Sequence, residues 1–369
     1  MIHSFRRPAS FPVMLIIMTA ALLLSLIFAL SLGPSRLPTH TVWEVALYHL
    51  TGIKLNSFSL AQEHIVLYLR FPRVFLAAIT GAGLAAVGVI LQAAVRNPMA
   101  DPYIIGVSPG AAVGAVLMLI LGWGDKIGQS GLAVAAFFGG LLAFAAVGLM
   151  AWRNGRLTPS RVILAGVAVS YLCTSLSSFL LLNSSEHVPS QAILYWLMGS
   201  VAGARWDQLA LPALLVAAGS VYALVKARSL NLIALGDENA CALGVHPDQL
   251  RFQLMIIAAL LTGVLVSVSG GVGFVALMVP HAVRLITGGD HQRLLPLAVL
   301  SGAVFLVWVD LAARLVIQPV ELPLTIVTAF IGTPFFSGYS DARNPLSKEQ
   351  AHEDYLLGNL LECRETAYP

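Results

Sequence analysis

The stretch VMLIIMTAALLLSLIFALSL, residues 13–32, decides the fold class of this chain. It has 20 residues and no charged side chain, and a helix needs about 20 apolar residues to span the hydrocarbon core of a bilayer. Arg6 and Arg7 precede it, as they would in a signal peptide, but the run is long for the hydrophobic region of such a peptide. No clear Ala-x-Ala cleavage site follows it, so we expect an uncleaved first membrane helix.

The composition extends this expectation to the rest of the chain. Of 369 residues, 58 % are hydrophobic and 11 % are charged, and the mean hydropathy is +0.83, whereas an average soluble protein is roughly 25 % charged. So few charges cannot cover a soluble domain of this size, which argues against a cytosolic enzyme, a nucleic-acid-binding protein and a disordered chain. The net charge of +3 is too small to indicate a polyanionic partner.

The apolar runs predict an all-α polytopic membrane protein with ten crossings, two of them short. A further apolar piece, 191–203, is too short to cross the bilayer. The predicted spans are Val13–Leu32, Val74–Val95, Ile104–Trp123, Gly131–Trp152, Val162–Leu182, Leu209–Val225, Phe252–Val268, Phe274–Thr287, Leu294–Val309 and Pro323–Phe336.

The basic residues predict the orientation of these spans, because cytoplasmic connections carry an excess of Lys and Arg. With the N-terminus inside, the inner connections hold 11 basic residues and the outer ones 7. Ten crossings then place the C-terminus inside as well. The tail 337–369 has 3 basic and 6 acidic residues, so we expect a polar cytoplasmic appendage after a transmembrane domain over residues 1–336.

Motifs for chemistry are few. No Gly-x-x-x-x-Gly-Lys phosphate loop, no His-Glu-x-x-His and no CxxC pair occurs, and Cys173, Cys241 and Cys363 lie far apart. The residues therefore predict no cofactor, no resident metal ion and no ATP hydrolysis by this chain. Gly106–Gly110 fits the Gly-x-Ser-x-Gly nucleophile elbow, but a membrane loop precedes it where the elbow needs a strand.

Charged residues inside the predicted spans are candidates for function, because such charges are costly. They are Arg284, Asp310 and Arg314. Asp310 and Arg314 are four residues apart on one helix and can pair, which favours a structural ion pair. An ion-coupled secondary transporter that works alone is the alternative, and it would need a carboxylate such as Asp310.

Two connections stand out by their side chains. Residues 229–246, SLNLIALGDENACALGVH, have the pattern of a short amphipathic helix outside the membrane, which suits docking into a groove of a partner or lying on the lipid surface. Before the second span, in the stretch 69–73, Arg70 lies before Pro72 and Arg73 directly after it. Such arginines form a fixed basic spot or extend toward the membrane surface.

Several motifs in sequence order resemble the FecCD-type permeases, the membrane subunits of type II ABC importers for iron–siderophores, haem and cobalamin. The resemblance covers residues 69–336, and its motifs carry no information on which chelate is transported. The motifs are RFPR at 70–73, Gln92 with RNPMADP at 96–102, GVSPGA at 106–111, LAGV at 164–167, WLMGS at 196–200, ALG at 234–236 with LGV at 243–245, GGVGFV at 270–275 with VPH at 279–281, and ELP at 321–323 through GTPFF at 332–336.

The resemblance implies a fold of ten helices and a homodimer in the bacterial inner membrane. It also implies two cytoplasmic ATP-binding subunits, one periplasmic substrate-binding protein, and alternating access of the pathway. By position, it implies that Arg70, Arg73 and Arg314 meet acidic residues of the binding protein. It further implies that residues 229–245 enter the ATPase groove as the coupling loop, through Leu230, Leu232, Leu235, Gly236, Asp237, Glu238, Ala240, Leu243 and Gly244, and that Asn97, Met99, Thr158 and Ser160 form the cytoplasmic constriction.

The end of the chain departs from the family pattern, which continues apolar for about two more helical turns. Here Ser337–Asp341 intervene after Phe336. At 1.5 Å per residue, 323–336 reaches about 20 Å against a hydrocarbon core of roughly 30 Å. We therefore expect a shortened last helix.

Overall fold

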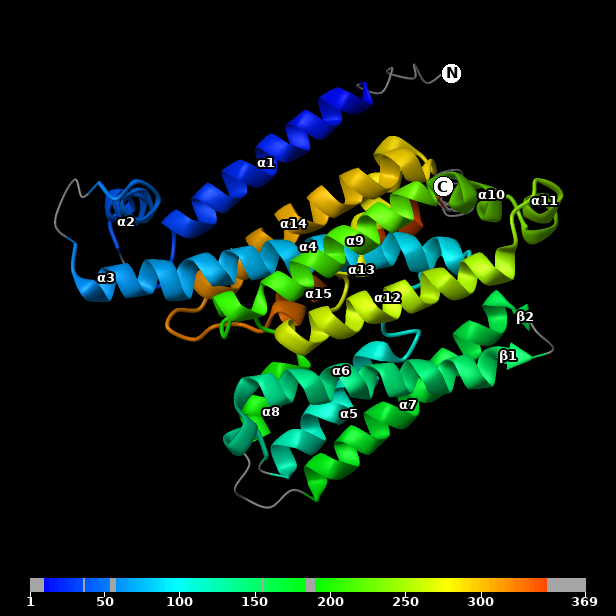
Figure 1. The fold of residues 1–369 in the computed structure, drawn as a ribbon, viewed down its shortest axis with the longest axis horizontal. Helices are drawn as coiled ribbons and strands as arrows, with labels where there is room; N and C mark the ends of the chain where they lie inside the picture. Colours follow the sequence, from blue (N-terminus) through cyan, green and yellow to red (C-terminus); the bar gives the residue numbers. More distant parts are fainter. Residues whose placement is uncertain are drawn as a thin grey trace, which may run out of the picture. The chain divides into compact units, whose positions relative to one another are not determined.

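The computed structural model describes residues 10–35, 37–53, 58–121, 123–153, 156–183 and 190–343, which are mainly helical (Figure 1). The chain divides into two units, residues 1–328 and 329–369. The packing described below is that of the first unit.

In the described residues, seven helices are long and apolar enough to cross a membrane, and three shorter apolar helices accompany them. Each of the ten predicted spans coincides with one of these ten helices, so the polytopic helical fold is confirmed. They are α1 (Phe11–Ser31), α4 (Phe71–Ala94), α5 (Val107–Ile120), α6 (Trp123–Ala151), α7 (Pro159–Leu182), α9 (Ala210–Val225), α12 (Pro247–Ser269), α13 (Val275–Thr287), α14 (His291–Leu315) and α15 (Leu324–Arg343).

The remaining elements lie in the connections. A short β-hairpin joins α6 to α7. Its strands, β1 (Trp152–Arg153) and β2 (Arg156–Leu157), have two residues each, and Trp152 pairs with Leu157. The short helices are α2 (Thr39–Thr51), α3 (Leu60–His64), the π-helix η1 (Ile65–Arg70), α8 (Ser190–Leu197), the 3-10 helix η2 (Trp206–Gln208), α10 (Ala227–Ala234) and α11 (Asp237–Ala242).

The second span begins earlier than its apolar run. Ser59 caps α3 by accepting from the Gln62 N–H, while the Gln62 side chain accepts from the Ser59 N–H, a capping box that starts a helix. From Leu60 the chain stays helical through η1 to the end of α4. The π-helical turn ends at Arg70, a predicted site residue, and such turns are frequent at functional sites.

Helix α2 was not predicted, because its sequence contains no long apolar run. Its buried residues Val42 and Val45 pack on Val66 of η1, so tertiary contact rather than hydropathy stabilises it. In Figure 1, α2 is seen nearly along its axis while α1 runs across the view, so the two helices cross steeply. We call this end of the first unit the α2 end, and the opposite end, with α10, α11 and the hairpin, the α11 end.

Helix α4 is the centre of the first unit, with 83 % of its most apolar window buried. It packs against α14, α12 and α13. A Cβ on Gly81 would collide with the Gly302 carbonyl of α14, and one on Gly88 with the Ala276 carbonyl of α13. Small residues let membrane helices approach closely, and here they allow backbone contact on two sides of α4.

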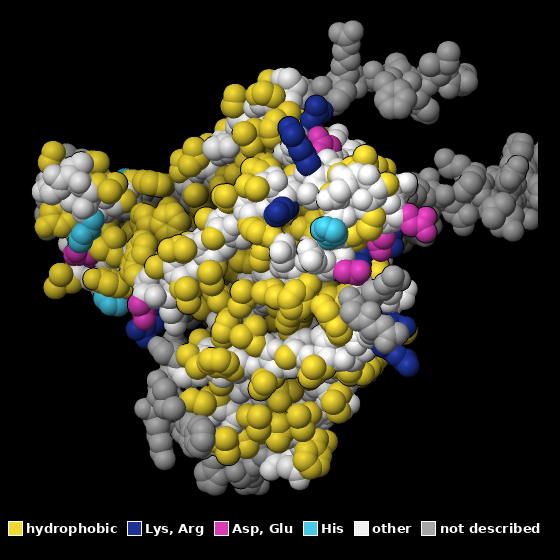
Figure 2. Space-filling model, turned by 45° about the vertical axis from the view of Figure 1, so that its right-hand side comes forward, with side chains coloured by type: hydrophobic (Ala, Val, Ile, Leu, Met, Phe, Trp, Pro, Cys, Tyr) yellow, Lys and Arg dark blue, Asp and Glu magenta, His cyan; other side chains and the backbone are white. Residues whose placement is uncertain are grey.

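The peripheral helices expose their apolar side chains instead. In the most apolar windows of α1, α6 and α7, 17 %, 22 % and 28 % of the residues are buried, and Ile16, Leu142 and Leu172 are largely exposed. Figure 2 shows hydrophobic side chains over wide areas of one face, interrupted by few charged ones. Such a surface fits contact with lipid rather than water.

The Gly-x-Ser-x-Gly stretch forms no nucleophile elbow. Turns, not a strand, precede Gly106, which has φ +78° and leads directly into α5. Gly110 and Gly114 pack on the backbone of α6 at Gly139 and Ala135. These glycines therefore serve helix packing.

Helix α15 corrects the expectation of a last helix that stops at Phe336. Its apolar part spans Leu324–Ser337, but the helix continues to Arg343, because polar residues without Pro or Gly beyond 338 can still propagate a helix. The remainder of the predicted polar tail, 344–369, lies outside the described residues.

Candidate functional site

The α11 end carries the segment predicted to couple to an ATPase. Helix α10 buries Leu230 and Ile233 fully, and Leu232 is half-buried. The Asn231 amide donates to Asp290 Oδ1 at 2.8 Å, and its Oδ1 accepts from the His291 backbone N–H at 3.0 Å. The Asn231 hydrogen bond is the main cause that lowers the pKa of Asp290. These contacts fix α10 to the first turn of α14.

Helix α11 confirms the short helix expected after Gly236. Gly236 has φ +111° and ends the preceding turn, and Asp237 and Glu238 form the first acidic turn, where carboxylates favour a helix N-terminus. Ala240 is fully buried. The two leucines expected to contact a partner, Leu235 and Leu243, are 64 % and 62 % exposed, and Gly244 beside them is also exposed.

Asp237 ties α11 to the body of the protein. Its Oδ1 lies 3.0 Å from Arg251 Nη2 of α12, and its Oδ2 lies 3.5 Å from Arg96 Nη2 at the end of α4. The Arg251 side chain is 1 % exposed and that of Asp237 is 39 % exposed. The carboxylate therefore links a buried cation to a helix on the surface.

The four residues predicted at the constriction come from two segments at this same end. Asn97 and Met99 follow α4, with Asn97 Oδ1 accepting from the Met99 N–H at 2.9 Å. Thr158 precedes α7 and Ser160 lies in its first turn, and both are exposed. Thr158 makes no side-chain cap. Whether these residues narrow a pathway remains a prediction.

The three arginines predicted to dock a binding protein gather at the α2 end, but they are buried. Arg70, Arg73 and Arg314 are 4 %, 9 % and 2 % exposed. Arg70 donates to the Leu30 carbonyl at 3.0 Å and the Ser35 carbonyl at 2.6 Å, which holds the end of α1 and the following turn.

Arg73 and Arg314 share one carboxylate. Arg73 Nε lies 2.9 Å from Asp310 Oδ1, and Arg314 Nε lies 3.1 Å from Asp310 Oδ2. Arg73 Nη1 also lies 2.9 Å from Glu321 Oε1, before α15. This confirms that Asp310 and Arg314 pair. The prediction that the arginines contact a partner stays a prediction, and their burial does not support it for the chain alone.

The roles of three polar residues were not predicted from the sequence. Arg251 was counted only as a basic residue, Glu321 only as part of a motif, and Asn231 only as a loop residue. The available signal for Arg251 was its position directly before the apolar run that begins at Phe252, since a charge that becomes buried there needs partners. Glu321 and Asn231 depend on contacts distant in sequence.

A partly buried carboxylate lies between α4 and α5. Burial raises the pKa of Asp101 to about 6, although it accepts a hydrogen bond from the Ile104 N–H at 3.1 Å. Burial, with the nearby Asp101, also raises the pKa of Tyr103 to about 12. Asp101 therefore titrates closer to neutral pH than an ordinary aspartate.

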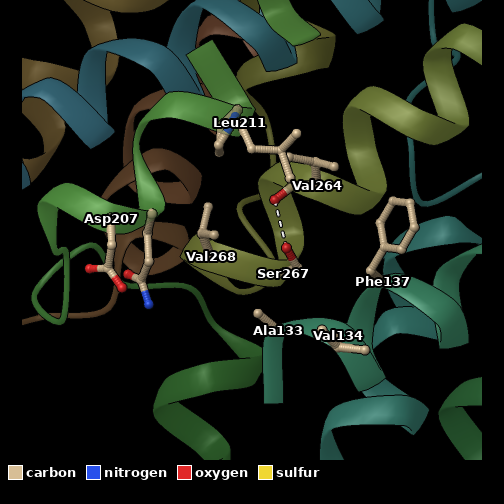
Figure 3. Close-up of a pocket in the computed structure, with 10 residues that line it drawn as sticks. Ala133, Val134, Phe137, Asp207, Leu211, Val264, Ser267 and Val268 are labelled. Carbon is tan, nitrogen blue, oxygen red and sulfur yellow. Dashed lines mark hydrogen bonds between the residues drawn. The ribbon is translucent and has the colours of Figure 1, made fainter. Parts of the chain in front are cut away.

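Several cavities open near the α2 end. One, of about 230 Å³, lies between α6, α9 and α12 and is mainly apolar, with Ser267 bonded to the Val264 carbonyl and Asp207 at its edge (Figure 3). Another, of about 220 Å³, lies between α5, α7 and α8. Its polar groups are uncharged and include Tyr103, Ser108, Thr174, Ser177 and Ser178. In the part of the chain that the structure describes, no three His, Cys, Asp or Glu side chains could jointly hold a metal ion.

Comparison with known proteins identifies the family. The FecCD transport family matches residues 21–339, which is most of the chain. The chain belongs to the FecCD transport family.

Relatives and a solved structure agree with this membership. The chain is 43 % identical to the cobalamin import system permease protein BtuC of Halobacterium salinarum, over 73 % of this chain and 71 % of the relative. It is 37 % identical to the hemin transport system permease protein HmuU of Yersinia pestis, over 85 % and 92 %. A metal-chelate type ABC transporter in an inward-facing conformation superposes with a TM-score of 0.76 at 32 % identity, over 88 % of this chain and 97 % of that one.

The comparisons confirm the predicted family and the all-α permease fold. They describe a multi-pass membrane protein from a family of transport permeases. The cargo named differs between the relatives, cobalamin in one and hemin in the other.

Proposed function

We propose that this chain is the membrane-spanning permease subunit of an ATP-driven importer. Its cargo would be an iron chelate (siderophore or haem) or cobalamin, carried from the periplasm to the cytoplasm by alternating access. The observation that carries the proposal is the α11 end of this FecCD family member. There Leu235 and Leu243, which directly follow α10 and α11, are exposed, while Asn231 and Asp237 anchor the two helices to α14 and α12.

The α11 end is the proposed binding surface for the ATP-binding subunits. The chain forms a homodimer, and two ATP-binding subunits bind its α11 end in the cytoplasm. Its N- and C-termini lie on that side. An apolar groove suits the exposed leucines at the ends of α10 and α11, because amphipathic helices bind partners by laying an apolar face into a groove.

Reconstitution tests this function. The chain, its ATPase subunits and its binding protein are placed in vesicles with labelled siderophore, haem or cobalamin. We expect ATP-dependent uptake of one of them.

Leu243→Asp should prevent assembly with the ATPase, because a buried charge without a partner is costly. Leu50→Asp, at an 85 % exposed position of α2, is the matched control and should assemble normally. Full ATP-driven uptake by Leu243→Asp would contradict the coupling role.

Docking of a periplasmic binding protein at the α2 end is a further part of the proposal, with Arg70, Arg73 and Arg314 as candidate contacts. Since these side chains are buried in the single chain, such contact requires the α2 end to open. Charges at an interface rim act mainly on the association rate. If Arg70→Gln associates with the binding protein as fast as the unchanged protein at low salt, Arg70 is not a contact.

A stand-alone ion-coupled transporter would need a carboxylate that exchanges its ion. Asp310 is the predicted candidate, but Arg73 and Arg314 nitrogens lie 2.9 and 3.1 Å from it. Its charge is balanced inside the protein, which favours the ATP-driven importer. Uptake by the purified chain alone, driven by a proton or sodium gradient, would contradict the proposal.

A further inference from the structure

Among the residues that the structure describes, Arg251 has the largest fully buried side chain, and its guanidinium joins four segments. Its Nε donates to the Ala94 carbonyl at 2.8 Å, and its Nη1 to the Leu157 carbonyl at 2.8 Å. Its Nη2 donates to Asp237 Oδ1 at 3.0 Å, and its Nη1 reaches Asp248 Oδ1 at 3.4 Å. A guanidinium presents its donors in a rigid plane, so these partners are held in fixed relative positions.

The partners of Arg251 connect both predicted sites of the α11 end. Ala94 is the last residue of α4, three residues before Asn97. Leu157 is the last residue of β2 and directly precedes Thr158. Asp237 is the first residue of α11. One buried cation thus bridges the coupling helix to both segments of the predicted constriction.

We infer that Arg251 is a positioning residue that transmits displacement of α11 to the segments carrying Asn97 and Thr158. This inference rests on the proposed function, because an ATPase must move α11. The guanidinium is hydrogen-bonded to α11 through Asp237, whose side chain is 39 % exposed. Its other partners are the carbonyls of Ala94 and Leu157 and, at 3.4 Å, the Asp248 carboxylate of its own helix.

The burial of Arg251 makes this connection stiff. If α11 moves and Asp237 leaves, a buried charge loses a main partner, which is strongly unfavourable. The guanidinium therefore follows Asp237, and the carbonyls of Ala94 and Leu157 follow the guanidinium. Asp248 reinforces the same direction, because its Oδ1 also accepts from the Leu157 N–H at 3.3 Å.

The test compares a spectroscopic signal with transport. A spin label is placed at Leu164→Cys, a 70 % exposed position of α7 one turn after Ser160, in a chain whose three native cysteines are replaced by serine. The chain is assembled with its ATPase subunits in vesicles. We expect ATP to change the mobility of the label, and Asp237→Asn and Arg251→Lys to reduce the shifted population about fivefold, a typical size for coupling between sites.

Each variant has a defined purpose. Asp237→Asn removes the charge at a partly exposed position, so it tests the link even if Arg251→Lys does not fold. Arg251→Lys keeps the charge but replaces the fork by a single point donor, and it leaves α11 itself unchanged. Asp237→Glu should restore part of the signal. Arg293→Gln, an exposed arginine of α14, is the matched control and should behave as the unchanged protein.

Two results overturn the inference. If Asp237→Asn and Arg251→Lys give the full ATP-dependent signal and normal uptake per ATP, Arg251 is only a structural residue and the proposed function survives. If the unchanged complex transports no substrate and shows no signal at position 164, the proposed function fails, and the inference fails with it.

Discussion

Asp310 balances two buried arginines, and its loss should be costly. Asp310→Asn leaves Arg314, which is 2 % exposed, without a carboxylate, while Arg73 keeps Glu321. Removing one partner of a buried ion pair typically destabilises by about 3–5 kcal/mol. We expect a loss in this range in the free energy of unfolding, measured by denaturant titration of the purified protein in detergent.

The matched control for Asp310→Asn is Asp207→Asn, the same chemical change in an exposed pair. Asp207 and Arg205 have side chains that are 55 % and 57 % exposed, and exposed ion pairs contribute about 0–1 kcal/mol. Asp207→Asn should therefore change stability little. Equal effects of both substitutions on the free energy of unfolding would show that the ion pairs of Asp310 contribute no more to stability than an exposed pair.

Asp101 should make stability depend on pH. Burial raises its pKa in the folded protein from 3.8 to about 6, so the folded state binds the proton more tightly than the unfolded one. Its stabilising contribution is complete below about pH 4 and is lost as the pH rises through 6. We expect the thermal unfolding midpoint to fall between pH 4 and 7, and Asp101→Asn to flatten this part of the profile. An unchanged profile in Asp101→Asn would assign the slope to other groups.

For individual side chains, the sequence predicts partners that are close along the chain but not distant ones. The spacing of Asp310 and Arg314 predicts their pairing, because residues four apart on a helix are neighbours. Arg73 lies 237 residues from Asp310, so only the packing of α4 on α14 brings them together. The same holds for Arg251 and Ala94, which are 157 residues apart. The predicted docking arginines were found together, but buried.

The contact between α4 and α14 depends on glycine at the crossing point. A Cβ on Gly81 would collide with the Gly302 carbonyl, so Gly81→Ala must push the two helices apart. Overpacking of this kind costs about 1–3 kcal/mol. We expect Gly81→Ala to lower the thermal unfolding midpoint of the detergent-purified protein.

Gly148→Ala of α6 is the control for this substitution. Nothing lies within 4 Å of a Cβ at Gly148, and alanine is favoured over glycine in a helix by about 1 kcal/mol. This change should leave the midpoint equal or slightly raised. If Gly81→Ala is equally harmless, the two helices are not held at backbone contact.

Elements were predictable where hydropathy alone decides them. The ten spans follow from apolar runs, and α11 follows from Gly236 and the acidic residues after it. Helix α2 and the extension over α3 and η1 did not follow, because Val42, Val45 and Val66 find apolar partners only in the folded chain. The predicted end of the last helix was wrong, because the end of an apolar run limits a membrane span but does not have to end the helix.

The distribution of basic residues over the two ends predicts how the first unit is oriented in the membrane. The α11 end carries the connections with the excess of Lys and Arg, including Arg96, Lys226 and Arg228. The α2 end carries fewer, and two of its arginines, Arg73 and Arg314, are buried in ion pairs. Since basic connections are retained on the cytoplasmic side, the α11 end should face the cytoplasm.

Reporter fusions test this orientation. A fluorescent protein that folds only in the cytoplasm should be bright when fused after Val245, beyond α11. A phosphatase that folds only in the periplasm should be active when fused after Gly52, beyond α2. Both results follow if α1 crosses outward and α4 returns, since α2 lies between them and α11 lies between α9 and α12. The reciprocal fusions, phosphatase after Val245 and fluorescent protein after Gly52, serve as controls and should be silent. Phosphatase activity after Val245 would place α11 outside, where no ATPase subunit could reach Leu235 or Leu243, and the proposed coupling would be excluded.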